Sequence, residues 1–151
     1  MNTKQQERLN QILKKRSENI ESIRFFEDYF EKLTYGIIKK AISEINDSLM
    51  MSSNEMLRLF NDNPYEHTRG RYFIMIQLFT ETDRRRSVFF DNTNNFPSLI
   101  FEGNEFKANV DTYIKINEKK ENLKSFPIAE LISGDKVYDL LIDFLEKSFN
   151  N

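Results

Sequence analysis

The feature that most constrains this chain is a helical hydrophobic pattern that runs through almost all of its first third. Apolar side chains recur there in steps of three and four residues, which keeps them on one face of a helix. The members of this face are Leu9, Ile12, Leu13, Ile20, Ile23, Phe26, Phe30, Leu33, Ile37, Ile38, Ile42, Ile45 and Leu49. An unbroken helix from Thr3 to Leu49 would be about 70 Å long at 1.5 Å per residue. A compact domain of this size is only about 30 Å wide, so the helix either projects or breaks.

The expected position of a break is the segment Thr34–Gly36. A glycine inside a helix costs about 1 kcal/mol relative to alanine, and the two halves of a broken helix could both pack on the rest of the domain. The alternative is a helix that pairs with another chain. Its heptad pattern is imperfect because Arg16 and Glu27 fall on the seam, so a long regular coiled coil is not expected.

After Asn54 the pattern changes to one typical of β-strands. Strands are predicted at residues 55–62, 71–80, 87–91, 98–102 and 105–116. The strand at 71–80 has apolar side chains on both faces, which predicts a central position in the sheet. Gly103 and Asn104 form a two-residue hairpin signal. The strand that follows alternates between an apolar face, from Phe106 to Ile116, and a polar face.

The rest of the chain predicts a charged connector at 117–124 and a helix from Gly134 to Ser148 with Ser133 as its N-cap. Pro127 is expected to open a short helical turn before that helix. The apolar stripe of the helix consists of Val137, Leu140, Leu141, Phe144 and Leu145.

The order of the elements is helix, antiparallel meander of four to five strands, and helix, which is typical of an α+β fold. We therefore predict a single α+β domain over residues 1–151. It comprises a helical arm or helix pair at 1–50, an antiparallel sheet at 54–116 and a C-terminal helix at 127–149.

The composition excludes several kinds of site. The chain has no cysteine, which excludes a disulfide, a thiolate zinc site and a cysteine nucleophile. Its net charge of -2 is not typical of proteins that coat nucleic acid. The polar amino-terminal segment does not resemble a signal peptide, and no stretch approaches the roughly 18 apolar residues of a membrane-spanning helix. We therefore expect a cytoplasmic protein that does not associate with a membrane.

Neither a metal nor a cofactor is expected. Glycine-rich phosphate-binding motifs are absent from the sequence. The single histidine, His67, lacks the partners that a triad or a multi-histidine metal site needs. Asp91, Glu105 and Lys107 superficially resemble the acidic and lysine residues of a metal-dependent nuclease. A metal-dependent hydrolase is therefore kept only as a third hypothesis.

The arginines near the strand at 71–80 support a second hypothesis, which is binding of nucleic acid or of a phosphorylated ligand. These arginines are Arg69, Arg71, Arg84, Arg85 and Arg86. The planar guanidinium group suits phosphate recognition, and such binding would weaken as salt is added. The alternative interpretation is a charged hairpin tip that prevents edge-to-edge association of sheets.

The first hypothesis rests on the amino-terminal helix, whose aromatic residues give it apolar groups on more than one side. One small sheet cannot easily cover so wide an apolar surface. We therefore expect a non-enzymatic protein-interaction module that self-associates or acts as a small adaptor, chaperone-like or immunity-like subunit. The expected interface residues are Ile23, Phe26, Phe30, Leu33 and Ile37. On this hypothesis, Phe26→Asp or Ile37→Asp breaks an assembly and leaves the sheet folded.

Overall fold

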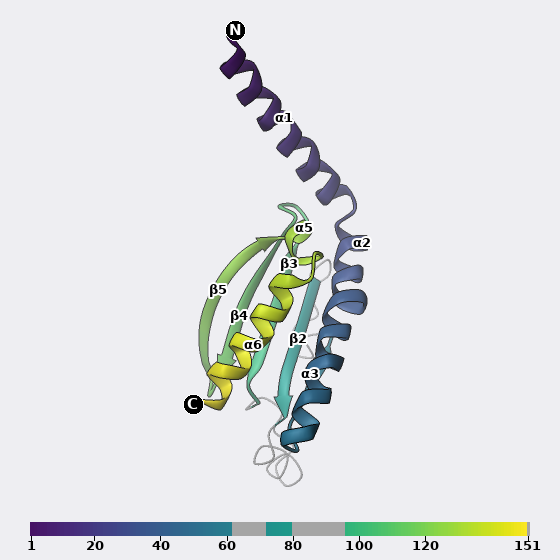
Figure 1. Cartoon of the computed structure of the whole chain (residues 1–151), viewed down its shortest axis with the longest axis vertical. Coiled ribbons are helices and arrows are strands. Elements are labelled where there is room, and N and C mark those ends of the chain that lie inside the picture. The colour runs from purple at the N-terminus through teal and green to yellow at the C-terminus, as the bar shows by residue number, and fades with distance from the viewer. Residues whose placement is uncertain (62–71, 80–95, 151) are drawn as a thin grey trace.

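A computed structural model of the chain describes residues 1–61, 72–79 and 96–150 (Figure 1). A long helical arm comes first, five strands follow, and two helices end the described part, so the predicted α+β fold is confirmed. The helices are α1 (Thr3–Arg24), α2 (Phe26–Glu31), the π-helix η1 (Lys32–Ile38), α3 (Lys39–Ser52), α5 (Ile128–Leu131) and α6 (Asp135–Phe149). The strands are β1 (Met56–Phe60), β2 (Tyr72–Phe79), β3 (Ser98–Asn104), β4 (Asn109–Ile116) and β5 (Lys119–Pro127).

Helix α1 projects beyond the sheet, and the chain changes direction where α1 meets α2 (Figure 1). A capping box starts α1: the Gln5 backbone N–H donates to Asn2 Oδ1 at 2.8 Å, and the Asn2 N–H donates to Gln5 Oε1 at 3.1 Å. The helix ends at Phe25, whose φ of -106° and ψ of 22° depart from helical values. The bend therefore comes at Phe25 and not at Gly36, since turning the chain here directs Phe26 into the core.

Gly36 instead lies within η1, where the helix widens and continues. The Lys39 backbone N–H donates to the Thr34 carbonyl, five residues back, which is the hydrogen bond of a π-helix. The Thr34 hydroxyl donates to the Phe30 carbonyl at 2.8 Å. This side-chain donor competes for a backbone acceptor inside the helix.

The five strands form one antiparallel sheet in the order β1-β2-β3-β4-β5. Strand β2 therefore has a neighbour on each side, and both of its faces are largely buried, as predicted. The hairpin between β3 and β4 differs from the prediction, because its turn is Glu105–Ala108 and Gly103 lies inside β3. Phe106 is consequently in the turn and 81% exposed, not on the core face of a strand. The remaining apolar positions of that face, from Ala108 to Ile116, are buried as predicted.

Residues 119–124 of the predicted connector are instead part of β5, which pairs with β4. Asn117 and Glu118 have φ values of 52° and 66°, as a tight hairpin turn with two left-handed residues requires. In β5, all of which the structure describes, Phe126 is the one buried side chain. Because β5 is an edge strand with almost no alternation of apolar and polar residues, its sequence pattern resembles that of a connector. Its lysines suit an exposed sheet edge.

The helices α2, η1, α3 and α6 pack on one face of the sheet and form the main core with it. The predicted stripe of α6 is confirmed, since Val137, Leu140, Leu141 and Phe144 are buried and Leu145 packs against them. The N-cap of α6 is Gly134, with φ of 97°, and not Ser133. The Ser133 hydroxyl donates instead to the Glu130 carbonyl at 2.7 Å. The short helical turn expected after Pro127 is α5. The strand predicted at 87–91 lies outside the described residues.

A side chain of α3 satisfies the backbone of the edge strand β1. Asn46 Nδ2 donates to the Leu57 carbonyl at 3.0 Å, and the Leu57 N–H donates to Asn46 Oδ1 at 2.8 Å. We expect Asn46→Ala to lower the free energy of unfolding by about 1–2 kcal/mol, because both groups of Leu57 lose their partner. Denaturant unfolding measures the change. The exposed Asn10→Ala on α1 serves as the control, and equal stability of the two variants would contradict this role of Asn46.

Stability of the domain should not depend on most of α1. Every residue from 1 to 21 is exposed, and Ser22 alone is buried among the α1 residues, all of which the structure describes. Deletion of residues 1–20 should therefore leave the Tm within about 2 °C of the full chain, since exposed positions contribute little to stability. Thermal unfolding followed by circular dichroism measures both chains. A fall of 10 °C or more, on the order of several kcal/mol, would show that α1 packs on the domain.

Candidate interaction surface and pocket

The five interface residues predicted from the sequence do not form a free surface. Phe26, Phe30 and Leu33 are 1%, 6% and 0% exposed and belong to the core of this chain. Ile23 and Ile37 are half-buried and pack against the same core. The same hydrophobic pattern is compatible with a helix face that packs in the core and with one that binds a partner. These five residues pack in or against the core.

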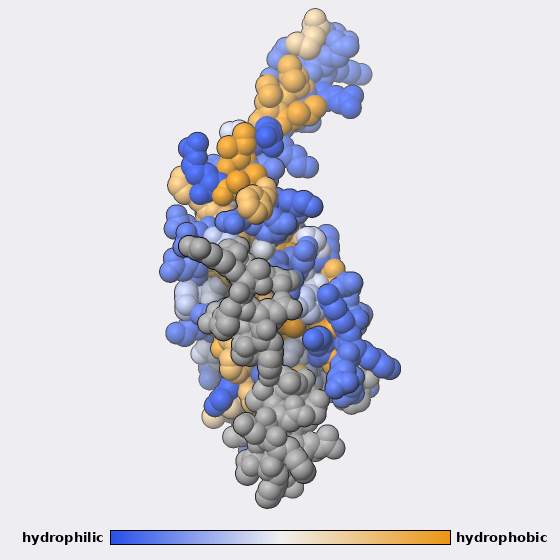
Figure 2. All heavy atoms as spheres, turned by 180° about the vertical axis from the view of Figure 1, so that it is seen from behind, coloured by the Kyte–Doolittle hydropathy of each residue, from blue (hydrophilic) through white to orange (hydrophobic). Residues whose placement is uncertain are grey.

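The exposed apolar surface lies further towards the amino terminus, on α1. Leu9, Ile12, Leu13 and Ile20 are 37%, 55%, 56% and 45% exposed. We call these four residues the α1 stripe. Their spacing keeps them on one side of the helix, and hydrophobic side chains run along α1 where it leaves the domain (Figure 2). The α1 stripe is part of the apolar helix face predicted from the sequence. The sequence alone does not show that these four residues are exposed while the later residues of the same face are buried.

The charge of α1 differs in sign from that of the rest of the chain. Residues 1–24 contain six lysines and arginines and three glutamates, a formal net charge of +3. The whole chain has a net charge of -2, so residues 25–151 have a net charge of -5. Arg16 lies in the middle of the α1 stripe, between Leu13 and Ile20. Helix α1 is therefore a basic amphipathic helix, a type that binds acidic protein partners or anionic membrane surfaces.

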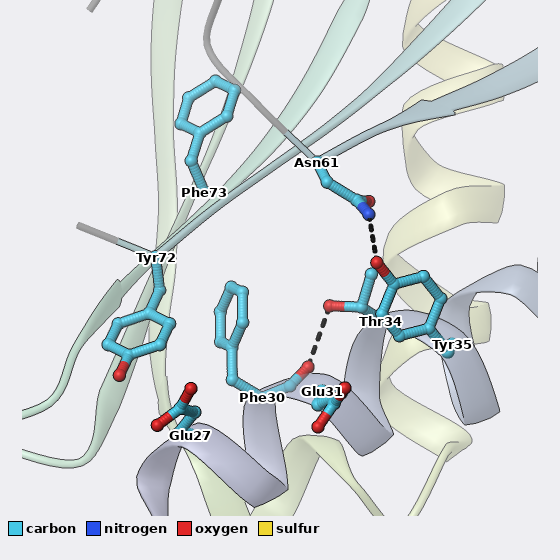
Figure 3. Close-up of a pocket in the computed structure, with 8 residues that line it drawn as sticks. All are labelled: Glu27, Phe30, Glu31, Thr34, Tyr35, Asn61, Tyr72 and Phe73. Carbon is cyan, nitrogen blue, oxygen red and sulfur yellow. Dashed lines mark hydrogen bonds between the residues drawn. The ribbon is translucent and has the colours of Figure 1, made fainter. Parts of the chain in front are cut away.

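A pocket of about 240 Å³ lies between the α2–η1 segment, the start of β2 and Asn61, which follows β1 (Figure 3). Its lining consists of Glu27, Phe30, Glu31, Thr34, Tyr35, Asn61, Tyr72 and Phe73. Glu27, Glu31 and Tyr35 come from successive turns of the helical arm, and Tyr72 and Phe73 begin β2. Two of the lining residues are joined directly, since Asn61 Nδ2 donates to the Tyr35 hydroxyl at 2.6 Å (Figure 3). The π-helical turn thus supplies two lining residues, as such turns often do at functional sites.

Tyr72 is the residue of this pocket with a perturbed titration. Burial raises the pKa of the Tyr72 phenol, and the negative charges of Glu105 and Glu27 raise this pKa further. The Tyr72 hydroxyl donates to Glu105 Oε2 at 3.4 Å. Tyr72 is therefore a protonated phenol at neutral pH, and it stands in a negative electrostatic environment.

Most of the other site residues predicted from the sequence lie outside the part of the chain that the structure describes. His67, Asp91 and the five arginines of the phosphate hypothesis, which are Arg69, Arg71, Arg84, Arg85 and Arg86, lie outside the described residues. Glu105 and Lys107 lie in the β3–β4 turn, not on the polar face of a strand as predicted. Within residues 1–61, 72–79 and 96–150, no group of three His, Cys, Asp or Glu side chains could hold a metal ion.

Among the helices that the structure describes, none is both long enough and apolar enough to cross a bilayer. Comparison of the chain with models of protein families, with curated proteins and with solved structures finds no match. Arguments about function therefore rest on the α1 stripe and on the pocket.

Proposed function

We propose that this protein is an interaction module that binds an acidic protein partner through the α1 stripe. The observation that carries the proposal is the exposure of Leu9, Ile12, Leu13 and Ile20 on a helix that projects from the domain. Exposed large apolar side chains scattered singly are ordinary, but a contiguous row of them marks an interaction site. Most of the stability of a helix in a protein comes from packing of its apolar face, so a partner that covered the α1 stripe would stabilise α1.

The charge pattern favours a partner of different sequence over a second copy of this chain. Ile12 and Ile20 each lie four residues from Arg16, and Leu9 and Ile23 each lie seven residues from it. An antiparallel pair of α1 helices that aligned these apolar residues would place Arg16 opposite Arg16. A parallel pair in register would do the same. Like charges within a helix seam oppose association.

A partner that fits the α1 stripe has an apolar groove or helix face with a carboxylate opposite Arg16. Such helix-in-groove binding uses anchors spaced by three, four and seven residues, which is the spacing of Leu9, Ile12, Leu13 and Ile20. The net charge of +3 on residues 1–24 would speed the encounter with an acidic surface.

Two variants with equal surface exposure test the proposal. Ile12→Asp places a charge in the α1 stripe, and Ile142→Asp places the same charge on α6, where Ile142 is 56% exposed against 55% for Ile12. The partner is captured from source-cell extract with the full chain, identified, purified and titrated against each variant. We expect Ile12→Asp to weaken the Kd by about 10- to 100-fold, and Ile142→Asp to change it by less than about twofold.

Light scattering of the purified chain, at low and high salt, tests the choice of partner. We expect the monomer mass under both conditions, because Arg16 opposes pairing of two α1 helices. A salt-stable dimer that Ile12→Asp dissociates would show self-association through the stripe instead. Equal binding by the Ile12→Asp and Ile142→Asp variants would contradict the whole proposal.

A further inference from the structure

We propose that the pocket between α2–η1 and β2 binds an alkylammonium ion, either a free amine or the side chain of a lysine in another protein. The pocket combines two carboxylates, from Glu27 and Glu31, with the rings of Phe30 and Tyr72, whereas the ring of Phe73 points to the other side of β2 (Figure 3). It is separate from the α1 stripe, so this inference does not depend on the proposed function.

The charge of the pocket calls for a cation. Its lining includes two glutamates and, among the residues that the structure describes, no lysine or arginine. The described ion pairs join Lys136 to Glu130 and Lys147 to Glu121, and none of them involves Glu27 or Glu31. A third carboxylate, Glu105, lies within hydrogen-bond distance of the Tyr72 hydroxyl. The negative charges of these carboxylates would attract a bound cation.

The aromatic wall selects an organic cation over a metal ion. Calcium and magnesium require a shell of oxygen ligands, and no three acidic, histidine or cysteine side chains in the described residues converge to supply one. Aromatic rings attract ammonium groups through their negative faces, and this attraction increases where water is excluded. Phe30 is 6% exposed and its ring lies 5.1 Å from that of Tyr72, so this wall of the pocket is largely shielded from solvent.

The size of the pocket limits the ligand to one small group. Sites for drug-sized ligands occupy about 300–1,000 Å³, and this pocket is smaller, at about 240 Å³. A four-carbon chain with a terminal ammonium group is of suitable size. Its carbon atoms would contact the Phe30 ring, and its nitrogen would lie near Glu27, Glu31 and the Tyr72 ring.

Titration with n-butylammonium, which reproduces the lysine side chain, tests the inference on the full chain. Its uncharged counterpart, n-butanol, serves as the ligand control, and chemical shifts of the Tyr35, Tyr72 and Phe73 resonances report binding. We expect saturable shifts in the millimolar range with n-butylammonium and at least about tenfold weaker binding of n-butanol. Equal binding of the two compounds, or an absence of saturable shifts, would overturn the inference.

Two double variants test whether binding of n-butylammonium requires the charges of Glu27 and Glu31. Glu27→Gln with Glu31→Gln should weaken n-butylammonium at least about tenfold. Glu18→Gln with Glu21→Gln removes the same charge from α1 and should change binding by less than about twofold. Equal loss in both double variants would show only a general effect of net charge and would overturn the site.

Titration with a short peptide that contains lysine tests whether the ligand is a free amine or the lysine side chain of another protein. Binding of the peptide at least about tenfold tighter than n-butylammonium would support the site and identify a protein side chain as its ligand. Equal or weaker binding of the peptide would support the site as one for a free amine.

Discussion

Replacing Phe26 by alanine should lower the free energy of unfolding by about 3–5 kcal/mol, as for other buried phenylalanines. Phe26 is 1% exposed. Its ring stacks on Phe30 with centroids 5.8 Å apart, and it meets the edge of Tyr72 at 4.9 Å. The replacement leaves a cavity at the point where the helical arm joins the sheet. At about 2–4 °C per kcal/mol for a chain of this length, the Tm should fall by at least about 6 °C.

The adjacent Phe25 provides a matched control for this prediction. Phe25 is 40% exposed and has a tilted ring contact with Tyr29 at 6.5 Å. Phe25→Ala should cost no more than about 1 kcal/mol. Denaturant unfolding of both variants measures the difference, and equal losses would contradict the position of the bend at Phe25.

The burial of Phe26 also changes the outcome expected for Phe26→Asp. The sequence pattern predicts that this variant loses an assembly and keeps its fold. With the side chain in the core, the variant would place an unpaired carboxylate among apolar groups, which is strongly unfavourable. We therefore expect Phe26→Asp to unfold the domain, so Ile12→Asp is the informative substitution for binding.

Replacing Gly103 by alanine should lower the free energy of unfolding by about 2–3 kcal/mol, and valine should cost more. A Cβ atom at position 103 would lie 2.8 Å from Tyr72 Cβ, 2.9 Å from Phe26 Cζ and 3.0 Å from Phe30 Cε2. Tyr72 is the cross-strand partner of Gly103, and its Cβ cannot move without moving the backbone of β2. Glycine is therefore needed here so that the aromatic residues of the arm can approach β3 closely.

Replacing Gly36 by alanine should change the free energy of unfolding in the opposite direction. A Cβ atom there would meet Lys32 Cγ at 3.7 Å, an ordinary contact. Gly36→Ala should therefore raise the free energy of unfolding by about 0.5–1 kcal/mol, because alanine loses less backbone entropy on folding. Denaturant unfolding of the two alanine variants gives the comparison. Destabilisation by Gly36→Ala equal to that of Gly103→Ala would contradict the packing described at β3.

The parts of the fold that could be predicted from the sequence are those with a strong hydrophobic period. The α6 stripe and the alternation of β4 are examples, since each element has one buried face. Strand β5 could not be predicted in this way, because eight of its nine side chains are not buried. The sequence predicts Ser133 as the N-cap of α6, but Gly134 occupies this position. Gly134 has a φ of 97°, because the chain turns here between α5 and α6. Glycine adopts that conformation readily and serine does not.

The candidate sites were less predictable than the fold. A helical period shows that Ile12 and Phe26 share a face, but not that the chain bends at Phe25 and leaves Ile12 exposed. The pocket brings Glu27 and Glu31 to Tyr72 and Phe73, which lie 41 to 46 positions later in the sequence. No local motif indicates such a contact. The π-helical turn at Lys32–Ile38 and the hydrogen bond from Thr34 to the Phe30 carbonyl within it are not specified by the sequence alone.

Hydrogen exchange of the α1 backbone amides, with and without the captured partner, tests most directly whether the α1 stripe is the interface. In the free protein we expect the α1 amides to exchange quickly, and those of β3 and β4 slowly, because α1 has almost no tertiary packing. Binding should slow exchange along α1 by at least about tenfold and leave β3 and β4 unchanged. Protection that appeared elsewhere while α1 continued to exchange at its free rate would show that the partner binds another surface.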